Sequence, residues 1–84
     1  MATGTIRYWA AAKDAAGCAE EPYDAATLAD ALTAARTGRD ARFAAVLARS
    51  SYLVDTAPVG KRDHAAVELS DGGVIEVLPP FAGG

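Results

Sequence analysis

Cysteine and histidine are almost absent from this sequence, which contains one of each, Cys18 and His64. A single cysteine cannot form a disulfide within the chain, and one cysteine with one histidine is too small a ligand set for a structural metal site. The sequence therefore predicts no bound metal, and a chain without disulfides is typical of a reducing cytoplasm.

Long hydrophobic runs and clustered basic residues are also missing. No apolar stretch is long enough to cross a bilayer, and residues 1–4 lack the charged and hydrophobic regions of a signal peptide. The formal net charge is -3 and Lys61-Arg62 is the only adjacent basic pair, whereas phosphate contacts need clustered Lys and Arg. We therefore expect a cytoplasmic protein with neither a membrane nor a nucleic acid among its partners.

The length of the chain restricts its class. Its 84 residues, 51% apolar and 23% charged, fit one compact domain. A domain of this size keeps about a third or more of its surface exposed and cannot easily enclose a deep pocket beside its core. This favours a binding or carrier role over a self-contained enzyme.

The start of the chain has the pattern of a β-hairpin. Residues 5–9 alternate with a period of two and are rich in β-forming side chains, which predicts a first strand. The alanine run after them leads to a turn signal at Gly17, and residues 18–23 are predicted to return as a second strand. Pro22 has no N–H to donate, which confines this strand to the edge of a sheet.

Two helices are predicted in the middle of the chain. Thr27 and Asp30 have the spacing of a capping pair, which predicts a helix over residues 28–37 that Gly38 ends in a left-handed cap. A second, short and alanine-rich helix is predicted over residues 40–49. The apolar residues expected to face the core recur at helical spacing: Leu28, Ala31, Leu32, Ala35, Phe43, Val46 and Leu47.

Short strands and turns fill the rest of the domain. Residues 52–54 are predicted to form a strand, 57–60 a turn, and 66–69 a short extended segment. The turn signal at residues 71–73 opens a last strand over residues 74–78, which is apolar at nearly every position, as strands buried on both faces are. This order suits an α+β domain in which helices pack on one side of a sheet.

The sequence ends in the segment Pro79-Pro80-Phe81-Ala82-Gly83-Gly84. The prolines fix φ and favour an extended path, and the glycines remove every side chain near the carboxylate, so the segment suits a narrow channel in another protein. We predict a domain over residues 1–78 and an extended tail over residues 79–84. The tail presents one reactive group, the carboxylate of Gly84.

A terminal carboxylate becomes useful once it is activated. Transfer of AMP from ATP makes a mixed anhydride, which sulfur attacks to leave a thiocarboxylate, and this is a good nucleophile. The chemistry takes place in the active sites of partners, which explains why the chain has no recognisable catalytic set.

The chain resembles the ubiquitin-like sulfur carriers, and among them the small subunits of molybdopterin synthase. Residues 5–10 look like the opening strand of that family, residues 27–32 like its first helix, and residues 71–80 like its closing turn and strand. The final Gly83-Gly84 is the specific signature. Pro79-Pro80 favours the molybdopterin branch over the thiamine carriers.

The resemblance implies a fold and a set of partners. The fold is an α+β β-grasp with a mixed sheet of about four to five strands packed on one face by helices. A ubiquitin-activator-like adenylyltransferase uses ATP to activate Gly84, which then carries sulfur as a thiocarboxylate, and the chain itself binds no cofactor. The tail residues then insert into the large synthase subunit: Pro79, Pro80, Phe81, Ala82 and Gly83. The chain is thus a non-catalytic subunit of a sulfurtransferase.

Alternatives remain open from the residues alone. The sulfur can serve thiamine or cysteine synthesis, Gly84 can be joined to a lysine as in a protein modifier, or the domain can be a plain interaction module. Phe81 can dock on a partner or pack on its own domain.

Four other side chains are candidates for a functional role: Tyr8, Trp9, Cys18 and His64. Cys18 is expected to pack rather than react, and His64 to lie exposed in a polar loop. Tyr8 and Trp9 point to opposite sides of the first strand, so at most one belongs to the core and the other is a candidate partner surface.

Overall fold

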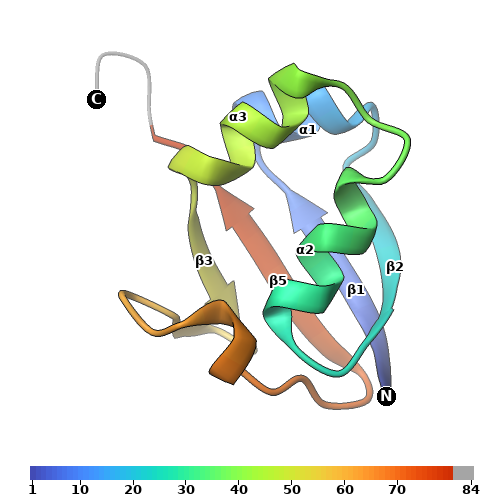
Figure 1. Cartoon of the computed structure of the whole chain (residues 1–84), viewed down its shortest axis with the longest axis vertical. Helices are drawn as coiled ribbons and strands as arrows, with labels where there is room; N and C mark the ends of the chain where they lie inside the picture. Colours follow the sequence, from blue (N-terminus) through green and yellow to red (C-terminus); the bar gives the residue numbers. More distant parts are fainter. Residues whose placement is uncertain (81–84) are drawn as a thin grey trace.

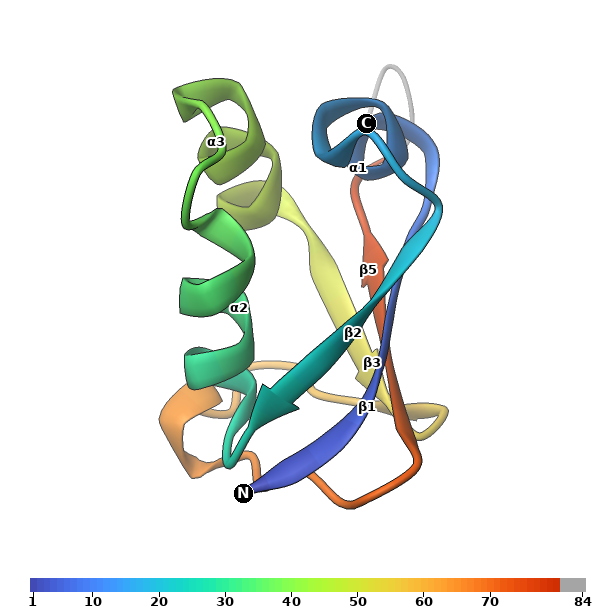
Figure 2. The same ribbon diagram turned by 90° about the vertical axis from the view of Figure 1, so that its right-hand side faces the viewer.

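The computed structural model describes residues 1–80, which form a twisted sheet with helices against one face (Figures 1 and 2). The elements follow in the order β1 (Ala2–Tyr8), α1 (Ala10–Ala16), β2 (Glu20–Ala25), α2 (Leu28–Arg36), α3 (Ala41–Arg49), β3 (Ser51–Val54), β4 (Ala57–Pro58), the 3-10 helix η1 (His64–Ala66) and β5 (Gly73–Leu78). The five strands have the order β2-β1-β5-β3-β4. β1 and β5 are parallel and the other neighbours antiparallel, so the expected mixed sheet with helices on one side is confirmed.

The core lies between the sheet and the helices. β1 and β5 each turn every second side chain toward α2 and α3, as the period of two predicts. The largest fully buried side chains come from both layers: Phe43, Ile6, Leu28, Ile75 and Val77. The predicted inner face of α2 is buried in full, and on α3 Phe43 and Leu47 are buried while Val46 is half-buried.

The cap predicted at Thr27 is confirmed, and α3 begins at Ala41, one residue later than predicted, because Asp40 is its N-cap. The Thr27 hydroxyl accepts a hydrogen bond from the backbone N–H of Asp30 at 3.2 Å, and the Asp40 carboxylate accepts one from Phe43 at 3.0 Å. α2 ends one residue before the predicted boundary. Gly38 follows with a φ of 79°, the left-handed conformation expected there.

The predicted turn between the first two strands is wrong, because the alanine run folds as α1. Alanine has the highest helix propensity of all residues. Gly17 closes this helix with a φ of 82°, its N–H donating to the Lys13 carbonyl. β2 therefore begins later than predicted, at Glu20, but Pro22 lies on an edge strand as expected.

Three smaller predictions near the end of the chain also need correction. The turn predicted at residues 57–60 contains the two-residue strand β4, and the extended segment at 66–69 is reduced to the end of η1 and a single bridge between Glu68 and Thr27. β5 is buried on one face only, because the helices cover only that side and residues such as Glu76 on the other remain half-exposed. Within residues 1–80 no helix has the length and apolar character that a membrane crossing requires.

Candidate functional site

The candidate site is the place where the chain leaves the sheet toward its predicted reactive end. β5 is the central strand, and its last residue, Leu78, pairs with Ser51 of β3. Pro79 is buried and Pro80 is exposed, so the chain reaches the surface between these two prolines. The remaining predicted site residues lie outside the described residues: Phe81, Ala82, Gly83 and Gly84.

We call the point where the tail leaves the sheet, at Leu78 and Pro79, the tail root. Trp9 lies beside the tail root on the side of β1. Its backbone N–H donates to the carbonyl of Val77 at 3.2 Å, and its side chain is 47% exposed, whereas Tyr8 is buried. The prediction that only one of the two aromatics belongs to the core is confirmed. Ala10 has a φ of 49°, a strained conformation for alanine that turns the chain from β1 into α1 immediately after Trp9.

An open pocket of about 560 Å³ surrounds Trp9. It is lined by the ends of β1 and β2 and by the start of α1: Arg7, Tyr8, Trp9, Ala10, Lys13, Asp14, Ala19 and Glu20. Arg7 and Glu20 form an exposed ion pair at 3.4 Å along its side. An exposed indole among charged side chains is typical of a protein contact surface, where one aromatic anchor is ringed by polar groups.

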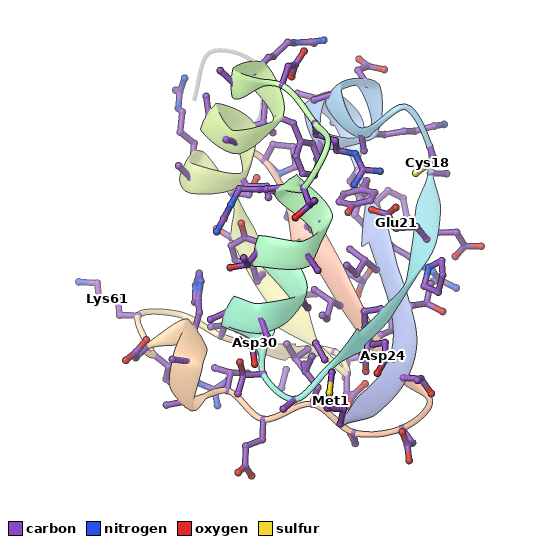
Figure 3. All side chains as sticks on the ribbon, turned by 45° about the vertical axis from the view of Figure 1, so that its right-hand side comes forward. Met1, Cys18, Glu21, Asp24, Asp30 and Lys61 are labelled. Carbon is purple, nitrogen blue, oxygen red and sulfur yellow. The ribbon has the colours of Figure 1, made fainter. Side chains whose placement is uncertain are left out.

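Arg39 and Glu21 form the strongest polar pair at this end of the molecule. The Arg39 guanidinium donates to both carboxylate oxygens of Glu21, at 2.8 and 3.0 Å. The hydroxyl of Tyr8 donates to the same carboxylate. Figure 3 shows Glu21 and Cys18 near the same end of β2. Sequence reasoning missed this pair, because its members lie far apart in the chain and follow no periodic pattern.

The same guanidinium also joins the helices to the sheet. It donates to the carbonyl of Ala35 at 2.6 Å and, through Nε, to that of Ala16 at 3.3 Å, both near helix ends whose carbonyls lack helical partners. It lies over the ring of Phe43, 4.8 Å from the centroid, and over that of Tyr8 at 5.8 Å. One side chain therefore fixes α1, α2 and α3 against β1 and β2, next to the pocket at Trp9.

The electrostatics follow from these contacts. Burial by itself would raise the pKa of Glu21, but the hydrogen bonds from Arg39 and Tyr8 outweigh it and hold that pKa below its ordinary value. The hydrogen bond to Glu21, against the cost of burial, raises the pKa of Arg39. Burial and then the bond to Glu21 raise the pKa of Tyr8. The pair therefore stays charged at neutral pH and the phenol stays neutral.

The other two candidate side chains have structural positions. Cys18 is half-buried and packs against the core, as expected, with its Sγ 3.9 Å from Arg39. His64 is not the fully exposed loop residue predicted, because η1 places it half-buried with its ring centroid 5.1 Å from that of Tyr52. Burial raises the pKa of Tyr52 to about 12, and its hydroxyl donates to the carbonyl of Leu47 at 2.6 Å.

Comparison with known proteins gives one family and several related structures. The sequence matches the ThiS family over residues 6–84. No significant match to a curated protein is found.

Three solved structures resemble the whole chain. Small archaeal modifier protein 1 from Methanosarcina acetivorans has a TM-score of 0.84 at 21% identity, covering 100% of this chain and 98% of that one. A putative molybdopterin converting factor, subunit 1, from Pyrococcus furiosus has a TM-score of 0.77 at 21% identity, covering 96% of this chain and 100% of that one. A chain from the complex of subunits 1 and 2 of the molybdopterin-converting factor of Helicobacter pylori has a TM-score of 0.68 at 22% identity, covering 98% of this chain and 99% of that one. These likenesses confirm the expected β-grasp fold.

Proposed function

The chain belongs to the ThiS family of ubiquitin-like sulfur carriers, and from this we infer that the carboxylate of Gly84 is the group that carries the sulfur. We further infer that the acceptor is the pterin precursor of the molybdenum cofactor, and that the chain is the small subunit of a molybdopterin synthase. We also propose that these steps take place in the cytoplasm.

One observation supports the proposal most directly. The strand that precedes the tail is the central one, paired with β1 on one side and β3 on the other, so the tail root is among the best-anchored points of the domain. Pro79 remains buried and Pro80 faces solvent, which suits a domain that holds the tail by its base and offers the rest to a partner.

The reaction takes place on the tail and in the partners. The carboxylate of Gly84 attacks the α-phosphate of ATP, pyrophosphate leaves, and an acyl-adenylate remains. Hydrosulfide then attacks the acyl carbon, and AMP leaves with the electron pair of the C–O bond. The thiocarboxylate sulfur next attacks a carbon of the acceptor, from which an oxygen leaves with the electron pair of the C–O bond. Water then hydrolyses the remaining acyl–sulfur bond, which leaves the sulfur on the acceptor and restores the carboxylate. A ubiquitin-activator-like adenylyltransferase performs the first two steps and the large synthase subunit the last.

Two findings favour the molybdopterin branch. The paired Pro79-Pro80 resembles that branch more than the thiamine carriers. One structure of the same fold comes from a complex between the two subunits of a molybdopterin-converting factor. Trp9 supports a partner on this side of the molecule, because it exposes a large apolar surface beside the tail root.

Intact-protein mass spectrometry tests the carrier role. The full chain is incubated with the adenylyltransferase of its host, ATP and hydrosulfide, in parallel with a chain that lacks Gly84. We expect an exchange of oxygen for sulfur in the full chain alone. If an enzyme that is active on another carrier leaves the full chain unchanged, the carrier proposal fails.

Two further measurements test which branch receives the sulfur and whether Trp9 contacts the activating enzyme. The thiocarboxylated chain is mixed with a large synthase subunit and the pterin precursor, and formation of the dithiolene identifies the branch. Trp9→Ala is expected to raise the KM of the chain as a substrate for activation without lowering its melting temperature, because Trp9 is half-exposed and contributes little to the core. An unchanged KM would exclude Trp9 from the contact.

A protein modifier is the second candidate function. The likeness to a small archaeal modifier protein extends over the whole chain, and the fold itself does not separate the two roles. Both share the adenylation step. Activated chain incubated with host lysate distinguishes them, because a modifier accumulates in isopeptide conjugates with lysine residues, whereas a carrier remains a free thiocarboxylate.

A further inference from the structure

The outer face of α3 is the most basic surface next to the tail root. Arg42 and Arg49 are seven residues apart and therefore share one side of the helix, about 10 Å from each other along its axis. Both are exposed, and neither makes an ion pair or a side-chain hydrogen bond with any of residues 1–80.

The pairing of β3 with β5 places the end of α3 next to the tail root. Arg49 is the last residue of α3, and Ser51, two residues later, pairs with Leu78 at the end of β5. In Figure 1, α3 crosses the end of the sheet from the neighbourhood of α1 to the start of β3, over the end of β5. Arg49 therefore lies next to the tail root on the side of β3, opposite Trp9, and Arg42 lies seven residues before it, toward the start of α3.

The local charge is opposite to that of the whole chain. Residues 36–49 hold four arginines and one aspartate, a formal charge of +3 in a chain of -3. Of these, Arg36 at the end of α2 donates to the Thr33 hydroxyl, Arg39 is engaged by Glu21, and Asp40 caps α3. Asp14 of α1 and Glu20 of β2 line the pocket at Trp9. Among residues 1–80, Arg42 and Arg49 thus remain on α3 as two cations without an acidic partner.

The reach of the tail brings a partner against this face. Five residues, 80–84, span at most about 18 Å when fully extended. Any enzyme that takes Gly84 into a buried active site must therefore bring the rim of its channel close to the tail root. That rim faces the end of α3, and free guanidinium groups there favour carboxylates on the opposing surface.

Resting on the proposed function, we propose that Arg42 and Arg49 form a docking surface for an acidic rim around the tail channel of the activating adenylyltransferase. The surface aligns the domain so that the tail enters its channel. Because the contact is at the rim of the interface, it acts mainly on association and weakens as salt rises.

Charge reversal with a matched control tests this surface. Arg42→Glu and Arg49→Glu each change the formal charge from -3 to -5, and Lys61→Glu makes the same change at an exposed residue of the loop after β4 (Figure 3). The rate of thiocarboxylate formation is followed by intact mass with the host adenylyltransferase, ATP and hydrosulfide, at about 0.05 M and about 0.5 M salt. Circular dichroism melts confirm that each variant is folded.

The expected result is specific in place and in salt dependence. At low salt each α3 reversal lowers kcat/KM by about three- to tenfold through a higher KM, Lys61→Glu lowers it by less than about twofold, and high salt removes most of the difference. Arg42→Gln and Arg49→Gln are expected to show about half of the effect in free energy, since they remove a charge without adding the opposite one.

Each contrary result has a definite meaning. Equal slowing by the α3 variants and by Lys61→Glu means that only net charge matters, and it overturns the docking surface while the carrier function stands. No slowing by either α3 variant overturns it in the same way. If the wild-type chain forms no thiocarboxylate, the proposed function is overturned and this inference with it.

Discussion

Removing the Arg39 guanidinium should loosen the end of the molecule that carries the candidate site. Arg39→Ala deletes both hydrogen bonds to Glu21, the bonds to two helix-end carbonyls and the contacts with the rings of Phe43 and Tyr8. Among residues 1–80, it also leaves Glu21 with a side-chain hydrogen bond from Tyr8 alone. The loss therefore combines an ion pair, helix caps and packing in one substitution.

The size of the effect follows from the burial of the pair. Arg39 and Glu21 are 21% and 26% exposed, between a surface pair, worth about 0.2–1 kcal/mol, and a fully buried one, whose breakage costs about 3–5 kcal/mol. We expect Arg39→Ala to lower the free energy of unfolding by about 2–3 kcal/mol. For a domain of this size that corresponds to a melting temperature lower by about 10–20 °C.

Urea denaturation followed by circular dichroism measures this, with a double-mutant cycle between Arg39→Ala and Glu21→Gln. We expect a coupling free energy of about 1–2 kcal/mol. Arg42→Ala is the matched control, since its guanidinium is exposed and unpaired within residues 1–80, and should change stability by less than about 0.5 kcal/mol. If Arg39→Ala costs no more than Arg42→Ala, or if the two single effects simply add, the reasoning about this pair is wrong.

Three further predictions concern stability. Because the folded-state pKa of Glu21 is lowered, its contribution to stability is present above the unfolded pKa of about 4.3 and is lost as pH falls through the folded pKa. The gap in unfolding free energy between wild type and Glu21→Gln should therefore shrink as pH falls below the unfolded pKa, and a constant gap would contradict this. Gly4→Ala places a methyl group against the Gly73 carbonyl and the Tyr23 ring and should cost about 1–3 kcal/mol by calorimetry, so wild-type stability would refute the clash. Thr56 has a φ of 71° in the β3–β4 turn, a conformation that glycine adopts without strain. Thr56→Gly should therefore raise the free energy of unfolding in urea by about 0.5–1 kcal/mol, and an unchanged value would show that the turn is not strained.

The elements that the sequence predicts well are those with a clear period and a cap. β1 and β5 alternate, α2 follows the predicted cap at Thr27, and α3 has an apolar face at helical spacing. α1 was missed because seven residues, mostly alanine, give no amphipathic pattern, and its closing Gly17 resembles a turn. β4 was missed because it has two residues and its turn, Asp55-Thr56, adopts positive φ without glycine.

The candidate site divides in the same way. The tail and the exposed aromatic at its root are encoded locally, by the residue types themselves and by the alternation of Tyr8 and Trp9. The Arg39–Glu21 pair joins residues 18 positions apart through the packing of a loop between helices on an edge strand. The closeness of Arg49 to Leu78 depends on strand order. Neither is written in a local pattern, because both depend on which strands become neighbours.

The central position of β5 also has a consequence for synthesis of the protein. Of the elements described, β5 leaves the ribosome last, and it is the strand that joins β1 to β3. Until it arrives, the nascent chain holds two strand pairs with no ladder between them, and each is too small to be stable alone. A chain cut short before residue 73 is therefore expected to stay open and to expose its backbone to proteases, so that truncated copies would not compete with the finished protein for its partners.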